Sequence, residues 1–168
     1  MEKKEQRWKA AVVTLSDKGY AGEREDKSGP KIVEMLGEAG YDVKETLLLP
    51  DGREQLEKEL IRLADQRQIN VIFTTGGTGF AERDVTPEAT IAVCDRMANG
   101  IADAIRNYSM TITPRAMFSR AVSGIRKKTL IINLPGSPKA VQESLEFLLP
   151  NLDHGIGILR GSEGECAR

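Results

Sequence analysis

The sequence contains few of the residues on which several large classes of protein depend. Its 168 residues include two cysteines and one histidine. Cys94 and Cys166 lie far apart with no second cysteine or histidine nearby, which excludes a disulfide framework and a zinc-ligand motif. His154 is remote from any serine or cysteine motif, which disfavours hydrolases of the Ser/His/Asp and Cys/His types. We expect a reducing, cytoplasmic location.

An excess of one charge and long apolar runs are also absent. Lysine and arginine number 24 against 25 aspartates and glutamates, so no global basic field favours nucleic acid. Aromatic residues make up only 5%, which argues against base-stacking surfaces. No run approaches the roughly 18 apolar residues of a membrane span, and residues 1–7 are charged where a secretory signal is apolar. We expect neither a nucleic-acid nor a membrane partner.

The composition fits one globular α/β domain. With 40% hydrophobic residues in 168, the chain is long enough for a sizeable core, and we expect a single domain over residues 1–168 with flexible ends at 1–8 and 161–168. Strand patterns alternate with helix patterns in the first half, which favours a parallel sheet with helices on both faces. The segments are a strand at Ala10–Leu15, a helix from Ser28 to Gly40, a strand at Asp42–Leu49, a helix from about Gly52 to Gln68 and a strand at Val71–Thr75.

The second half predicts a broken helical region followed by a hairpin. The hairpin strands, Ala121–Ile125 and Thr129–Leu134, flank a short polar turn, so the sheet gains one antiparallel member. The helical segments are Thr86 to about Cys94, Asn99 to about Thr111, a short piece capped by Thr113-Pro114, and Pro138–Leu149. We therefore predict a three-layer α/β/α sandwich with a mostly parallel, mixed sheet.

One glycine- and threonine-rich segment is typical of an anion-binding site. The apolar strand at 71–75 runs into Thr74-Thr75-Gly76-Gly77-Thr78-Gly79, where glycines allow positive φ and close approach of a ligand to the backbone. Thr86 and Pro87 predict an N-cap and a first helical residue, so a helix N-terminus points toward the loop. Asp84 adds a carboxylate, which suits a cation that accompanies phosphates.

This segment matches neither common nucleotide motif. No Gly-Lys-Ser/Thr follows, as a Walker A loop requires, and Glu82 stands where the dinucleotide motif has its last glycine. An ordinary strand-to-helix turn, with Asp84 favouring the helix dipole, is the alternative interpretation.

Other predicted strands end in polar residues on the same edge of the sheet. Ligands of open parallel sheets collect at the carboxyl ends of the strands. Besides Thr74 to Asp84, the polar strand ends are Thr14 to Asp17, Leu49 to Asp51, and Leu134 to Lys139. Taken singly, each fits an N-cap or a simple turn. Together they predict one polar site.

These motifs, in this order, resemble the MogA/MoaB family of molybdenum cofactor biosynthesis, including the G domains of gephyrin-type proteins. Members carry Thr-Thr-Gly-Gly-Thr-Gly followed by Asp-Val-Thr-Pro-Glu/Asp-Ala, matched here by Thr74–Gly79 and Asp84–Ala89. The resemblance spans roughly Val12 to Ala140. Its remaining elements are Ser16-Asp17, Pro50-Asp51, Asn133–Gly136, and Phe118-Ser119-Arg120 where members have Leu-Ser-Arg.

The resemblance implies a molybdopterin adenylyltransferase, which transfers AMP from Mg-ATP to the terminal phosphate of molybdopterin and releases pyrophosphate. It implies catalytic and Mg²⁺-binding roles for Asp51 and Asp84, and a position for Ser119 near the pterin phosphate. The expected substrate- and phosphate-binding residues are Thr14, Ser16, Asp17, Thr74, Thr75, Gly76, Gly77, Thr78, Gly79, Ser119, Asn133, Pro135, Gly136 and Ser137.

Other functions remain open at this point. A non-catalytic molybdopterin-binding or scaffold module of the MoaB type would bind the pterin without turnover, and a nucleotide hydrolase would cleave ATP without pterin. A molybdate-inserting enzyme of the MoeA type carries additional large domains, for which 168 residues leave no room. The resemblance also implies a homotrimer with interface surface between Asn99 and Arg120, and transient contact with molybdopterin synthase or the molybdate-inserting enzyme.

Overall fold

A single mixed sheet organises the residues that the structure, a computed structural model, describes, which are 8–161. The strand order is β2-β1-β3-β6-β5-β4. β1, β2, β3 and β6 run parallel, whereas β5 is antiparallel to both of its neighbours, β6 and β4. The predicted mostly parallel sheet with one antiparallel strand is thereby confirmed. The strands are β1 (Lys9–Leu15), β2 (Asp42–Leu49), β3 (Val71–Thr75), β4 (Arg96–Met97), β5 (Ser123–Arg126) and β6 (Thr129–Leu134).

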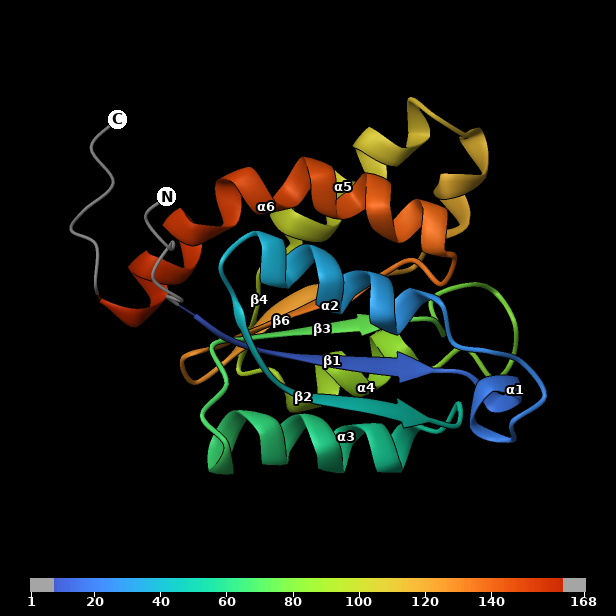
Figure 1. Ribbon diagram of the computed structural model, residues 1–168, viewed down its shortest axis with the longest axis horizontal. Coiled ribbons are helices and arrows are strands. Elements are labelled where there is room, and N and C mark those ends of the chain that lie inside the picture. The colour runs from blue at the N-terminus through green and yellow to red at the C-terminus, as the bar shows by residue number, and fades with distance from the viewer. Residues whose placement is uncertain (1–7, 162–168) are drawn as a thin grey trace.

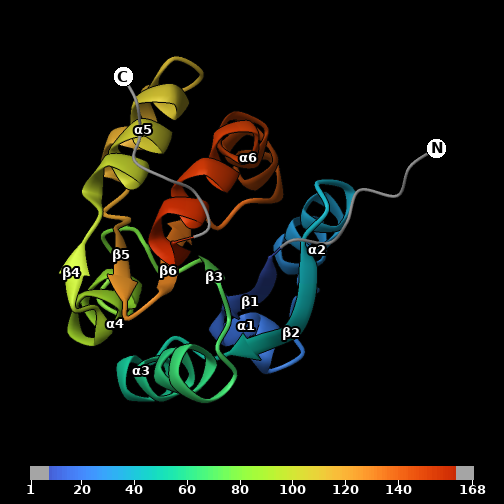
Figure 2. The ribbon, with the colours of Figure 1, turned by 90° about the vertical axis from the view of Figure 1, so that its left-hand side faces the viewer.

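Helices cover both faces of the sheet (Figures 1 and 2). α2, α5 and α6 lie on one face, and α3 and α4 lie on the other. The three-layer sandwich is therefore confirmed. The helical elements are α1 (Asp17–Tyr20), α2 (Ser28–Glu38), α3 (Arg53–Ile61) with the π-helical turn η1 (Arg62–Gln66), α4 (Thr86–Val93), α5 (Asn99–Met110), the 3₁₀ turn η2 (Pro114–Phe118) and α6 (Pro138–Arg160).

The central strands explain the apolar runs of the sequence. In β3, Val71 and Phe73 pack toward α2, α5 and α6, while Ile72 packs toward α3 and α4. β1 divides in the same way, with Val12 on the first face and Val13 on the second. A strand buried on both faces requires apolar residues at consecutive positions, as in other parallel sheets.

The last helix is longer than predicted. α6 continues past Pro150 to Arg160, although the pattern predicted an end near Leu149. Leu152 and Ile156 are buried in the core and extend the apolar stripe of the first half of the helix. Tertiary packing thus outweighs the helix-breaking tendency of Pro150. The short elements α1 and β4 were not predicted.

The predicted N-cap at Thr86 was wrong, and the hydroxyl groups of Thr86 and Ser28 both bind loops. Ser28 and Thr86 lie inside α2 and α4, which begin after Lys27 and Val85. The Ser28 hydroxyl donates to the Gly136 carbonyl at 2.7 Å, and the Thr86 hydroxyl donates to the Gly76 carbonyl at 3.0 Å. Both hydroxyls therefore fasten loops at the carboxyl edge of the sheet.

The predicted flexible ends fall mainly on 1–7 and 162–168, which lie outside the described residues, as does Cys166. Trp8 packs into the core, and its indole N–H donates to Asp153 at 2.9 Å. Gly161 closes α6 with a φ of +72°. Among residues 8–161, no helix has the length and apolarity needed to cross a bilayer.

Candidate active site

The carboxyl ends of β1, β2, β3 and β6 surround a cleft of about 750 Å³. This is the edge at which the sequence predicted a polar site, and the cleft brings together segments distant in sequence. The predicted residues that line it are Thr14, Ser16, Asp51, Thr75, Gly76, Gly77, Asp84, Gly136 and Ser137.

The glycine turn after β3 requires two of its glycines. Gly76 and Gly77 have φ of +93° and +70°, a region that other residues rarely adopt. A Cβ atom at Gly76 would collide with the Leu15 carbonyl oxygen, and one at Gly77 would collide with the Thr86 hydroxyl. Thr86 in turn donates its backbone N–H to the Gly77 carbonyl at 3.1 Å. The chain can therefore pass between the end of β1 and the start of α4 only with glycine here.

Asp17 and Asp51 join the ends of β1 and β2. The Asp17 N–H donates to Asp51 Oδ2 at 3.1 Å, and the Asp51 N–H donates to Asp17 Oδ1 at 2.9 Å. Arg83 donates through Nε and Nη2 to the two oxygens of Asp17 at 2.5 and 2.8 Å, and to the Asp51 carbonyl. This exchange fixes the Asp51 carboxylate at the floor of the cleft, where it lies close to Gly77.

The two joined aspartates differ in acidity. The hydrogen bond from Arg83 lowers the pKa of Asp17 below its ordinary value. Burial raises the pKa of Asp51, and the negative charges of Asp17 and Asp84 raise it further, against the lowering effect of the Asp17 N–H and Arg83. The Asp51 carboxylate therefore lies in an environment that a cation would stabilise.

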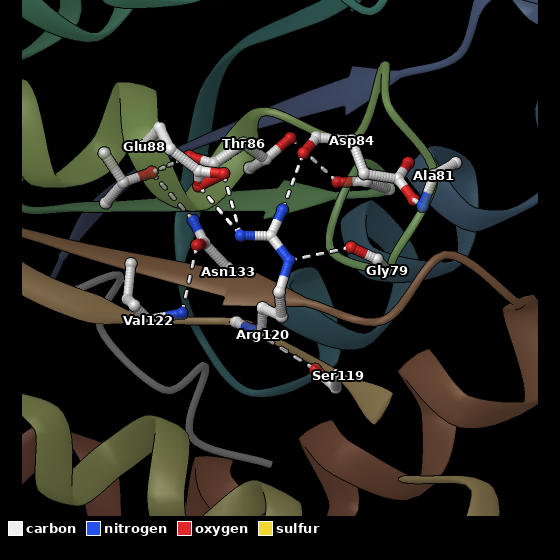
Figure 3. Close-up of polar contacts among 12 residues, drawn as sticks. Gly79, Ala81, Asp84, Thr86, Glu88, Ser119, Arg120, Val122 and Asn133 are labelled. Carbon is white, nitrogen blue, oxygen red and sulfur yellow. Dashed lines mark hydrogen bonds and ion pairs between the residues drawn. The ribbon is translucent and has the colours of Figure 1, made fainter. Parts of the chain in front are cut away.

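Asp84 reaches the cleft from an exposed turn that Arg120 holds (Figure 3). Within the turn, the Ala81 N–H donates to Asp84 Oδ2 at 3.0 Å, and the Asp84 N–H donates to the Ala81 carbonyl at 2.9 Å. Arg120 donates to the carbonyls of Gly79 and Asp84 and pairs with Glu88. Arg120 belongs to the Phe118-Ser119-Arg120 motif, but no role was predicted for it from the sequence.

Some predicted binding residues lie beneath the cleft rather than in its wall. Asn133 is fully buried and donates to the hydroxyls of Thr74 and Thr90 at 2.9 and 3.0 Å, while it accepts from the Val122 N–H. Thr78 is also buried. These residues tie strands and helices together under the site, so the structure gives Thr74, Thr78 and Asn133 a supporting position.

Ser119 lines a neighbouring cavity of about 240 Å³ between α5, η2 and the start of α6. Pro135 and one side of Asn133 also face this cavity. Arg106 holds the Ser119 carbonyl at 2.9 Å. Two other predicted residues contact the aspartates of the cleft. The Asp17 N–H donates to the Asp51 carboxylate, and Gly79 lies against the Asp84 carboxylate.

A charged segment after β1 adds cleft residues that the sequence reading missed. Five consecutive residues line the cleft together with the glycine turn, namely Arg24, Glu25, Asp26, Lys27 and Ser28. Asp26 caps α2 by accepting from the N–H groups of Ser28 and Gly29 at 3.1 and 3.0 Å. The available signal was the charged run just before the second predicted element, in which Arg24 and Lys27 flank the acidic pair Glu25-Asp26.

The carboxylates of the cleft suit a metal that arrives with its substrate. Among residues 8–161, no cluster of three or more His, Cys, Asp or Glu side chains could hold a metal ion. Mg²⁺ commonly binds through one or two carboxylates together with substrate phosphates and water. Asp51 and Asp84 face one cleft, and the negative charge of Asp84 raises the Asp51 pKa, so this pair fits that mode.

Comparisons with known proteins agree with the fold. A family model described as "Probable molybdopterin binding domain" matches residues 11–154. A molybdopterin adenylyltransferase of Helicobacter pylori is 41% identical over 153 residues, covering 90% of this chain and 87% of its own. Gephyrin of Dictyostelium discoideum is 42% identical over 167 residues, which are 94% of this chain and 23% of gephyrin.

The solved structures give the same result. The molybdopterin biosynthesis enzyme MoaB of Thermus thermophilus superposes with a TM-score of 0.87 at 42% identity, covering 92% of this chain and 98% of the other. The chain belongs to the molybdenum cofactor biosynthesis family that the matching family model describes.

Proposed function

We propose that this protein is a molybdopterin adenylyltransferase. An oxygen of the terminal phosphate of molybdopterin attacks the α-phosphorus of ATP, the bond from that phosphorus to the α,β-bridging oxygen breaks, and pyrophosphate leaves. The relatives named molybdopterin adenylyltransferase support this activity. The observation that carries it here is one cleft that Asp51, Asp84 and the Gly76-Gly77 turn line together with a mixed-charge segment, which supplies two basic and two acidic residues.

The reaction needs alignment and charge neutralisation more than a base. The second pKa of a phosphate monoester is about 6, so the attacking phosphate is largely ionised at neutral pH. The lack of a histidine in the cleft is therefore compatible with the reaction. Preorganised charges that hold two anionic substrates together supply most of the rate in such transfers.

Each wall of the cleft has a proposed task. Arg24 and Lys27 attract the polyphosphate, and the Gly76-Gly77 turn lets phosphate oxygens approach the backbone closely. Asp51 and Asp84 would hold the Mg²⁺ of Mg-ATP, which neutralises charge on the departing pyrophosphate. The cavity beside Ser119 would receive the pterin, with the phosphate of molybdopterin directed toward the cleft.

The deciding experiment measures pyrophosphate release from Mg-ATP with and without molybdopterin, with Asp84→Asn as the control variant. Release that requires both molybdopterin and the intact aspartate establishes the transferase. Tight pterin binding without release identifies a non-catalytic binding module, and release without pterin identifies a hydrolase.

We also propose that the protein assembles as a homotrimer through the region between Asn99 and Arg120. Four large apolar side chains in this region are 41–52% exposed, and exposed apolar side chains that gather in one region are a common feature of interfaces. They are Met110, Ile112, Met117 and Phe118. Light scattering should give three times the monomer mass for the wild type, and Ile112→Glu should lower it. A monomeric wild type would contradict the proposal.

A further inference from the structure

One guanidinium group holds both ends of the turn that carries Asp84 (Figure 3). Arg120 Nε donates to the Gly79 carbonyl at 2.8 Å, and Nη2 donates to the Asp84 carbonyl at 2.7 Å. The third nitrogen, Nη1, donates to both carboxylate oxygens of Glu88 at 2.8 and 3.0 Å. In addition, the Arg120 backbone N–H donates to the Thr78 carbonyl at 2.8 Å. A single residue thus contacts the start and the end of the turn and the first turn of α4.

The turn itself offers little packing that could fix its position. Residues 80–83 are exposed, and Phe80 has 70% of its surface accessible. Its contact with Phe118 is an edge-to-face pair with ring centroids 5.4 Å apart. On the other side, Arg83 donates to both oxygens of Asp17 and to the Asp51 carbonyl, but its side chain is 63% exposed, and exposure weakens such contacts. The Arg120 side chain is 37% exposed, so its bonds are the better-shielded of the two sets that tie the Gly79–Asp84 turn to other parts of the chain.

Arg120 is itself held from behind. Arg106, on α5, donates to the carbonyls of Ser119 and Ala121, the residues on either side of Arg120, at 2.9 and 2.6 Å. The backbone of residues 119–121 is thus bound to α5 through Arg106. The side chain of Arg120 extends from this segment to the turn. This arrangement connects the segment that lines the Ser119 cavity to the turn that carries Asp84.

We propose that Arg120 is a positioning residue for the adenylyl transfer, which fixes the Asp84 carboxylate at the cleft by clamping both ends of its turn. The inference rests on the proposed function for its kinetic consequences, but the clamp can be tested without turnover. A planar guanidinium can satisfy three acceptors in fixed directions, whereas a lysine ammonium acts as one point charge on a flexible stem. Charge alone is therefore not enough at this position.

Arg126 provides a matched control far from the cleft. Its Nε and Nη2 bind the two oxygens of Asp65 at 3.0 and 2.8 Å, and its Nη1 donates to the Val93 carbonyl at 2.9 Å. Arg126 therefore resembles Arg120, because each guanidinium donates both to one carboxylate and to at least one backbone carbonyl group. Arg126→Lys reports the general effect of replacing such a guanidinium on folding.

The first measurement compares steady-state kinetics of Arg120→Lys and Arg126→Lys with those of the wild type. We expect Arg120→Lys to lower kcat about 100-fold, because misplacing a reacting group by about 1 Å costs that much. The KM for molybdopterin should change by less than about threefold, because the pterin cavity is untouched. Arg126→Lys should keep kcat while it lowers the melting temperature at least as much as Arg120→Lys. Equal kcat losses in the two variants would overturn the proposal.

The second measurement is amide hydrogen exchange, which is independent of catalysis. The N–H groups of Ala81 and Asp84 form the two bonds inside the turn. We expect these amides to exchange at least about tenfold faster in Arg120→Lys and to stay at wild-type rates in Arg126→Lys. Unchanged protection in Arg120→Lys would show that the turn holds itself and would overturn the clamp. If the wild type lacked transferase activity, the proposed function would fail while this exchange result would still decide the clamp.

Glu88→Gln separates the hydrogen bonds that Arg120 makes to the turn from its ion pair with Glu88. The glutamine keeps an acceptor oxygen for Nη1 and leaves both backbone bonds of Arg120 in place. We expect a smaller loss of kcat than in Arg120→Lys. A larger loss would mean that the ion pair with Glu88 matters more than the hold on the turn, and would overturn the proposal.

Discussion

Asp51 and Asp84 face the same cleft, but their carboxylates are held in place in different ways. Asp51 follows a buried strand, and its side chain exchanges hydrogen bonds with the backbone of Asp17 at the end of the neighbouring strand. Asp84 lies on an exposed turn. Arg120, 36 residues further along the chain, restrains this turn by donating to the Asp84 carbonyl. One aspartate is positioned by the sheet, and the other by a turn that side-chain contacts tie to the rest of the chain.

The difference separates what each carboxylate depends on. Because the sheet brings the ends of β1 and β2 together, the position of Asp51 should survive most substitutions in the loops. Burial there raises the pKa of Asp51, so the charged form of this carboxylate lowers the free energy of unfolding. Asp84 can be displaced without unfolding the domain. Variants at the two sites should therefore differ in how activity and stability change together.

Asp84→Asn should have the largest effect. We expect the rate of pyrophosphate release to fall about 10²–10³-fold, the range seen when one preorganised electrostatic group is removed. The amide oxygen can still accept from the Ala81 N–H, so the melting temperature should stay within about 1–2 °C of the wild type. Asp42→Asn, at the other end of β2, is the control and should keep full activity. An inactive Asp84→Asn that is also unfolded would not support a role in the reaction.

Asp51→Asn should lower activity about 100-fold and raise stability. The amide oxygen can replace Oδ2 as the acceptor for the Asp17 N–H, while the charge that burial disfavours is removed. Denaturant unfolding at pH 7 tests the second part, with Asp84→Asn as the comparison. A destabilised Asp51→Asn would show that the negative charge itself supports the fold.

Arg83→Gln tests the exposed link between the two walls and should have a moderate effect. Arg83 lies on the Asp84 turn and binds Asp17, which in turn positions Asp51. We expect a loss of about tenfold in kcat/KM, the lower end of the range for groups that orient ligands. The Arg53→Gln variant removes a similarly exposed pair with Glu57 and should leave kcat/KM unchanged. An unchanged Arg83→Gln would mean that the sheet alone positions Asp51.

The same contrast explains how much could be predicted from the sequence. The ends of β1, β2 and β3 follow from apolar runs, and parallel strands must bring Ser16, Asp51 and Gly76 to one edge. Local pattern could not reveal that Thr86 and Ser28 use their hydroxyls to tie loops together, because a hydroxyl near a helix start usually caps the helix.

Residues that act across long separations in sequence were the least predictable. Asn133 belongs to a recognisable motif, yet its amide serves Thr74 and Thr90, and its burial depends on the packing of α4 against the sheet. The acceptors of the Arg120 side chain precede it by 32 to 41 residues, so no local sequence pattern indicates them. Only the assembled tertiary structure shows which carbonyls remain for it to bind.

The smallest expected effect is a change in the shape of the pH profile. Because the pKa of Asp51 is raised, kcat/KM of the wild type should fall as the pH drops through that pKa, in addition to the fall from protonation of the substrate phosphate near pH 6. Asp51→Asn should keep only the substrate limb. The stability effect has the opposite sign, because burial disfavours the charged Asp51: this group destabilises the fold above its folded pKa, and the effect fades as the pH falls from the folded to the unfolded pKa. Identical acidic limbs in the wild type and Asp51→Asn would remove Asp51 from the ionisations that control turnover and would leave Asp84 as the carboxylate on which the reaction depends.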